Sequence, residues 1–156
     1  MDFDLVFSLS SLLVMPFWLL MIFAGFWKFT ERVISVVWIL VPAALLYSIL
    51  VLPDIAGVLG QVSNPSLDGI AALLGTPQGA TIAWVHFLAF DVFVGRWAYL
   101  DGREQRIPWY LVSITLVFIL MLGPLGFLLY LALQTIWNTV RRNQRPTEAG
   151  GQTAST

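Results

Sequence analysis

Long stretches without charge alternate with short polar connections along this chain. Three stretches carry no Asp, Glu, Lys or Arg: Leu5 to Trp27, Val33 to Pro53 and Ile107 to Val140. A helix needs about 20 apolar residues to cross the hydrocarbon core of a bilayer, because it rises about 1.5 Å per residue. Each stretch is long enough and is therefore predicted to be a transmembrane helix.

The first stretch is predicted to be a retained span and not a signal peptide. Asp2 and Asp4 precede it, where a secretory signal peptide carries basic residues. It is also longer than the apolar region of a signal peptide, and no cleavage site with small residues follows it.

The last stretch can be interpreted in two ways. As one straight helix, residues 107–140 would extend roughly 51 Å. Trp109 at the start and Trp137 at the end resemble the aromatic belts of the two membrane interfaces. We therefore expect one tilted span, kinked at the central Gly123-Pro124-Leu125-Gly126. The alternative is a re-entrant pair of helices that breaks at that point.

A fourth predicted span, Pro77 to Leu100, differs because it contains His86, Asp91 and Arg96. Successive members of this set are about 140° apart around a helix, so no single stripe holds all three. We expect the other spans to surround this helix and shield it from lipid. Asp91 is nearest the middle of the membrane, whereas the long Arg96 side chain can reach an interface.

The connection from Pro53 to Thr76 is polar but contains a short helical pattern. Its apolar residues recur at helical spacing and predict an interfacial helix that ends at Gly75. They are Leu67, Ile70, Leu73 and Leu74. Thr76 as N-cap and Pro77 at the first helical position should start the charged span.

The predicted fold is an all-α membrane protein with four transmembrane helices in a bundle. The charged third helix is central, and the interfacial helix lies between spans two and three. Residues 1–140 form one membrane domain, and residues 141–156 form a polar tail that is predicted to be disordered. Asp2 and Asp4 before the first span, with Lys28 and Arg32 after it, favour an outside N-terminus. A re-entrant last segment would place every basic cluster on one side.

Composition supports a membrane protein and excludes several other classes. Apolar residues make up 58% of the 156 residues and charged residues 11%, and the mean hydropathy is +0.83. A soluble chain carries about a quarter charged residues, and a nucleic-acid-binding protein needs a basic stripe. With no Cys and one His, thiolate and multi-histidine metal sites are excluded. We expect no cofactor and no metal.

Two interpretations of His86, Asp91 and Arg96 remain open. Polar groups can pair structurally and hold helices together in a membrane. Ionisable residues at bilayer depth are also expensive and for that reason indicate function. An acid, a base and a cation in an apolar pocket suit proton transfer to a lipid-soluble substrate. They would equally serve a proton-coupled transporter.

The run TIAWVHFLAFDVFVGRWAYLDG from Thr81 to Gly102 resembles the signature of the neoxanthin-synthase-like family, also named for an abscisic-acid-deficient phenotype. GTPQGAT before it and GPLGFLLYL after it extend the resemblance. The resemblance implies a membrane protein required for the conversion of violaxanthin to neoxanthin, an epoxide opening to an allene without net redox change. His86, Asp91 and Arg96 would then be the catalytic acid, base and orienting cation. Aromatic side chains of the same run are expected to bind the substrate: Trp84, Phe87, Phe90 and Trp97.

The preferred hypothesis is a cofactor-independent isomerase that acts on a carotenoid or terpenoid lipid. The alternatives are a non-catalytic membrane partner that presents carotenoid to another enzyme, and a small proton-coupled transporter. The chain has no Ser-rich, Arg-rich transit peptide before its first span. We therefore expect a bacterial member of the family in the inner membrane. Its expected partner is a second copy of the chain or a membrane enzyme, and we expect no binding of nucleic acid.

Overall fold

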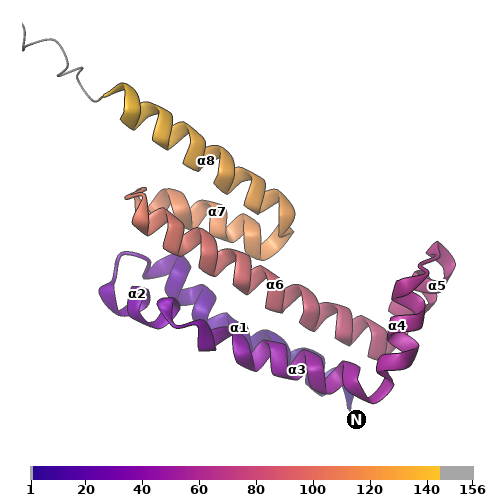
Figure 1. Ribbon diagram of the computed structural model, residues 1–156. Helices are drawn as coiled ribbons and strands as arrows, with labels where there is room; N and C mark the ends of the chain where they lie inside the picture. Colours follow the sequence, from indigo (N-terminus) through magenta and orange to yellow (C-terminus); the bar gives the residue numbers. More distant parts are fainter. Residues whose placement is uncertain (1, 145–156) are drawn as a thin grey trace, which may run out of the picture.

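A computed structural model describes residues 2–144 of the protein (Figure 1). All regular elements within this range are helices. The all-α class is confirmed for these residues, none of which forms a β-strand. The elements are, in chain order, α1 (Phe3–Phe23), α2 (Lys28–Ser35), the 3-10 helix η1 (Val37–Leu40), α3 (Val41–Val51), the 3-10 helix η2 (Leu52–Asp54), α4 (Ile55–Ser63), α5 (Leu67–Leu74), α6 (Pro77–Glu104), α7 (Trp109–Leu122) and α8 (Pro124–Asn143).

Helix α6 runs through the middle of the molecule. Helices α1 and α3 lie along one side of it, α7 lies along the other side, and α8 lies beyond α7 (Figure 1). The core is continuous across these layers, since Trp18 of α1, Val92 of α6, Ile119 of α7 and Tyr130 of α8 are all almost fully buried. Within a membrane, van der Waals contact between these closely packed side chains stabilises the core, because lipid tails are as apolar as the side chains themselves.

Three helical segments in the described part of the chain are long and apolar enough to cross a membrane. They are Phe3–Phe23, Val37–Ser63 and Pro77–Glu104, and Trp109–Leu122 is a shorter apolar helix. The first and third agree with predicted spans, and together with the exposed apolar side chains on α1 and α3 they support a membrane protein. A fourth full span is not present among these segments.

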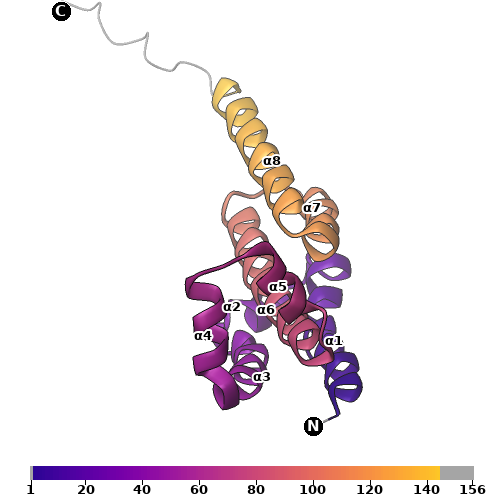
Figure 2. The same cartoon turned by 90° about the vertical axis from the view of Figure 1, so that its right-hand side faces the viewer.

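The second predicted span has different bounds from those expected. Val33 to Ser35 belong to the short amphipathic helix α2, which ends at Ser35 with Val36 as its C-cap. The apolar helical segment then begins at Val37 and passes through Pro53 into α4. Helix α4 turns away from α3 after this proline (Figure 2), because a proline removes a backbone hydrogen bond and kinks a helix.

The short helix predicted before the charged span, and the start of the helix that contains the charged residues, are confirmed. Helix α5 ends at Gly75 as expected, and the hydroxyl of Ser66 caps its first turn. The hydroxyl of Thr76 accepts a hydrogen bond from the backbone N–H of Gly79 at 3.0 Å, and Pro77 opens α6. Helix α6 then continues four residues beyond the predicted Leu100, to Glu104.

The single tilted span predicted for residues 107–140 is wrong. The chain breaks at Gly123, whose φ of 37° favours glycine, and α7 and α8 fold back on each other. A Cβ on Gly126 would lie 2.1 Å from the backbone nitrogen of Ile119, so the two helix backbones approach very closely there. The alternative of two helices that break in this motif is the observed arrangement.

The C-terminal tail begins later than predicted. Helix α8 includes Arg141 and Arg142 and ends at Asn143, with Gln144 as its C-cap. The predicted disorder of residues 145–156 lies outside the described residues.

Candidate functional site

Asp91 is at the centre of α6, beside the turn that joins α7 to α8. Its Oδ1 atom is 2.9 Å from the position where a Cβ on Gly123 would stand. The side chain is half-buried, and no hydrogen bond or ion pair with it occurs among residues 2–144. The carboxylate therefore depends on its surroundings, and not on a fixed partner, for stabilisation.

The start of α8 provides part of those surroundings. Gly123 is its N-cap and gives no side-chain hydrogen bond, and Pro124 has no N–H group. The backbone N–H groups of the next residues have no partner within the helix, and the positive end of the helix dipole lies here. The Asp91 carboxyl group thus lies beside the positive end of a helix dipole.

His86 lies one and a half turns before Asp91, on an exposed part of α6. Its ring stacks on Phe90 at a centroid distance of 4.8 Å and contacts Tyr47 of α3 at 5.4 Å. His86 and Asp91 point in directions about 140° apart. The imidazole is accessible from the same open side as Phe90.

Arg96 does not join these two groups. Its Nε donates to the carbonyl oxygen of Ile34 at 2.8 Å, and its Nη2 donates to that of Ser35 at 2.7 Å. These carbonyls are at the C-terminus of α2, where a helix leaves acceptors without partners. The guanidinium therefore fastens α2 to α6, and the three predicted catalytic residues do not form one cluster.

The four aromatic residues expected to bind substrate fall into two groups. Trp84 stacks on Phe7 of α1 at 5.2 Å and donates to the hydroxyl of Ser11. Trp97 makes an edge contact with Tyr130 of α8 at 5.5 Å. Both are thus engaged in helix packing.

Phe87 and Phe90, in contrast, are open, with exposed fractions of 57% and 59%. Phe93 follows them and is 52% exposed. The expectation that α6 is enclosed on all sides is therefore wrong. Helix α7 is too short to cover the N-terminal half of α6, and this half presents an aromatic face that leads to Asp91.

Sequence reasoning missed a polar network between α6 and α8. Asp101 Oδ2 accepts hydrogen bonds from Tyr130 Oη and from Gln134 Nε2, the latter at 2.7 Å. Asn138 donates to the side chain of Gln105 at 2.6 Å. Polar side chains recur every four residues along α8, at Tyr130, Gln134 and Asn138. This polar stripe on an otherwise apolar helix was the sequence signal that could have predicted the network.

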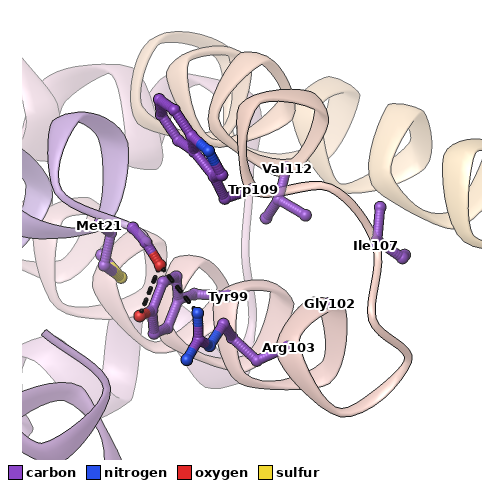
Figure 3. Close-up of a pocket in the computed structure, with 8 residues that line it drawn as sticks. Met21, Tyr99, Gly102, Arg103, Ile107, Trp109 and Val112 are labelled. Carbon is purple, nitrogen blue, oxygen red and sulfur yellow. Dashed lines mark hydrogen bonds between the residues drawn. The ribbon is translucent and has the colours of Figure 1, made fainter. Parts of the chain in front are cut away.

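Two hollows in the structure differ in their chemistry. The first lies between α1 and α6, where Tyr99 Oη and Arg103 Nη1 both donate to the carbonyl oxygen of Gly25, at 3.2 and 3.4 Å (Figure 3). Its free space of about 10 Å³ holds one water and no lipid. Arg103 also forms an ion pair with Glu31 of α2.

The second hollow is an open apolar groove of about 340 Å³ between the first half of α1 and helix α3. Val6, Leu9, Leu13, Pro42, Leu45, Leu46 and Ile49 line it. Its lining can hold an apolar chain but offers no group for acid–base chemistry. No set of three or more His, Asp or Glu side chains in the described ranges is placed to hold a metal ion.

Comparison with known proteins gives one consistent result. A family model described as ABA DEFICIENT 4-like matches residues 5–130. The chain is 28% identical over 140 residues to "Protein ABA DEFICIENT 4, chloroplastic" of Arabidopsis thaliana, a match that covers 85% of this chain and 62% of the relative. This chain thus spans less than two thirds of that relative's length. No solved structure matches significantly.

Proposed function

Because the chain belongs to the ABA DEFICIENT 4-like family, we propose that it is an integral membrane protein that binds a carotenoid or related terpenoid lipid and isomerises it by proton transfer, without a cofactor. The observation that carries this proposal is the position of Asp91. Its carboxylate lies midway along a membrane-length helix, beside a helix N-terminus and without a hydrogen-bonding partner among the described residues. An ionisable group is costly at that depth and is accepted where it has a function.

The open aromatic face of α6 supports an extended apolar substrate. Phe87 precedes Asp91 by four residues, so both lie on one side of the helix about one turn apart. Phe90 adds a second exposed ring beside His86. A flat conjugated chain can lie against such rings and bring one of its ends to the carboxylate.

The chemistry follows from the epoxide opening that the sequence resemblance implies. Asp91 removes a proton from a carbon next to the epoxide, and the electrons of that C–H bond form a new carbon–carbon double bond. The epoxide carbon–oxygen bond breaks, and the oxygen takes the same proton back from the Asp91 carboxyl group, since His86 faces Tyr47 of α3 on another side of α6. The product is an isomer of the substrate, and the return of this proton restores the Asp91 carboxylate.

Arg96 takes a positioning role in this scheme. Its guanidinium is occupied by the carbonyls of Ile34 and Ser35. It therefore acts on the site through the placement of α2 and α6, and does not contact the reacting atoms.

The test is expression in a bacterial host that makes epoxy-carotenoids, with pigment analysis by chromatography. We expect a new carotenoid isomer with the unchanged chain and none with Asp91→Asn. Asp54→Asn is the matched control, since Asp54 is exposed at the end of η2, and it should leave conversion unchanged. Equal conversion by Asp91→Asn and the unchanged chain would disprove the catalytic role. Thermal unfolding of each purified variant shows whether the fold persists.

A second candidate function is the holding and presentation of carotenoid to another membrane enzyme. The apolar groove between α1 and α3 favours it, because this groove binds without offering a reactive group. In that case the purified protein would retain a coloured polyene, and conversion would require a second protein. Leu9→Trp, which fills the groove, should then reduce the retained pigment, while Asp91→Asn should not.

A further inference from the structure

Most charged side chains lie at the two ends of the molecule, with Asp91 and Arg96 between them. Four exposed aspartates lie at the end that holds the N-terminus and helices α4 and α5 (Figures 1 and 2): Asp2, Asp4, Asp54 and Asp68. No Lys or Arg in the described ranges lies at this end. The opposite end, formed by α2, the α6–α7 turn and the last turns of α8, carries six basic and three acidic residues: Lys28, Arg32, Arg103, Arg106, Arg141 and Arg142, with Glu31, Asp101 and Glu104. We call this opposite end the basic end.

Hydrogen bonds hold the parts of the basic end together. Arg103 of α6 is paired with Glu31 of α2. Arg141 of α8 donates to the carbonyl oxygen of Gln105 in the α6–α7 turn at 2.7 Å. The last turns of α8 therefore return to the face where α7 begins. The helical hairpin enters and leaves at one end of the molecule.

Four cations of the basic end are exposed and have no bonded partner among residues 2–144: Lys28, Arg32, Arg106 and Arg142. Trp27 and Tyr110 lie at the same end with exposed fractions of 54% and 55%, and Trp109 packs against the exposed Phe26. Exposed Trp and Tyr beside Lys and Arg are typical of the membrane interface. An amphipathic helix such as α2 lies naturally in the headgroup layer.

We propose that the basic end is a docking surface for the anionic lipid headgroups of one leaflet, and that this contact sets the orientation of the protein. Charge complementarity is the basis, since the exposed cations face the headgroup layer while the aromatic rings occupy the boundary with the acyl chains. Each Lys or Arg near an anionic surface contributes attraction that salt screens. The aspartates of the other end face the opposite side of the membrane.

One consequence is an odd number of crossings. The segments Phe3–Phe23, Val37–Ser63 and Pro77–Glu104 are long and apolar enough to cross the membrane. Helix α7 has 14 residues and extends about 21 Å, short of a core about 30 Å thick. The α7–α8 hairpin is therefore re-entrant, and Asn143 lies on the cytoplasmic side with the other basic residues, opposite to the N-terminus.

The absence of cysteine from the sequence makes orientation directly measurable. Single variants Asn64→Cys, at the acidic end, and Asn143→Cys, at the basic end, are labelled with a membrane-impermeant maleimide in intact bacterial spheroplasts. We expect Asn64→Cys to react at once and Asn143→Cys only after permeabilisation. Labelling of both from outside, or of Asn143→Cys alone, would overturn the orientation.

The lipid contact is tested with purified protein in vesicles of phosphatidylcholine, with or without phosphatidylglycerol. We expect phosphatidylglycerol to raise the Tm, and added salt to remove most of this rise. The variant Lys28→Gln/Arg32→Gln should lose much of the rise, while Asp54→Asn/Asp68→Asn should keep it. An equal rise in both variants, or a rise insensitive to salt in the unchanged chain, would refute a headgroup surface. The salt measurement decides the matter if the first variant does not fold.

Discussion

The Asp91 carboxylate lies against the backbone of Gly123, with its Oδ1 2.9 Å from the position of an added Cβ. Two elements far apart in sequence thus meet at the middle of α6. The contact leaves no space for a side chain at position 123, and the φ of 37° disfavours one as well.

Replacement of this glycine should therefore be costly. We expect Gly123→Ala to lower the free energy of unfolding by about 1–3 kcal/mol through backbone strain alone, and to displace the Asp91 carboxylate. Gly60→Ala is the control, because no atom lies within 4 Å of the added Cβ. Unfolding in detergent micelles, followed by circular dichroism, checks both variants. Equal stability of the two would contradict the tight contact.

A second close contact joins α1 to α6. A Cβ on Gly95 would lie 2.5 Å from Cη2 of the buried Trp18 indole. Gly95→Ala should cost about 1–3 kcal/mol of unfolding free energy, since overpacking forces neighbours apart. Trp18→Phe removes the atoms that clash, so the double variant should be more stable than the sum of the two single effects indicates. If the effects of the two substitutions on the unfolding free energy are additive, the contact with Trp18 is not the cause of the destabilisation by Gly95→Ala.

The hydroxyl of Tyr130 contributes to the attachment of α8. It donates to Asp101, and the ring is fully buried. We expect Tyr130→Phe to lower the unfolding free energy by about 1 kcal/mol, the usual effect of one lost hydrogen bond. Tyr110→Phe is the matched control because Tyr110 is 55% exposed. The prediction fails if the two substitutions have the same effect on the unfolding transition.

Arg96 should matter for α2 more than for overall stability. Lysine cannot reproduce the two parallel donations to Ile34 and Ser35, because it has a single ammonium group in place of a planar fork. We expect Arg96→Lys to increase hydrogen exchange in α2 severalfold, measured by mass spectrometry, and to leave exchange in α1 unchanged. Arg142→Lys should change neither. If Arg96→Lys leaves hydrogen exchange in α2 unaltered, Arg96 does not position α2.

Local signals in the sequence predicted local structure well. Leu67 to Leu74 form the expected short helix, and Thr76 with Pro77 begin α6 at the expected residue. Such features depend on capping hydroxyls and apolar spacing within a few residues of each other. Such features can therefore be predicted from the sequence without knowledge of the fold.

The hairpin was harder to predict, because a kink and a turn share the same local pattern. Pro124 fits both a bent span and the first position of a new helix. What decides between them is the contact of Gly126 with the backbone of Ile119, which exists only once α7 and α8 pack together. The roles of the ionisable residues are non-local in the same way. The α2 carbonyls that occupy Arg96 come from 61 and 62 residues away.

The shortness of α7 has a consequence for biogenesis. A 14-residue apolar helix that ends in a glycine–proline break is a poor substrate for independent insertion by the translocon, which favours segments of about 20 residues. Its partner α8 carries Gln134, Asn138 and two arginines, and is no better suited to enter lipid alone. The hairpin must consequently settle against α6 after the longer helices are in the membrane, so that the surroundings of Asp91 are completed as the last step of maturation.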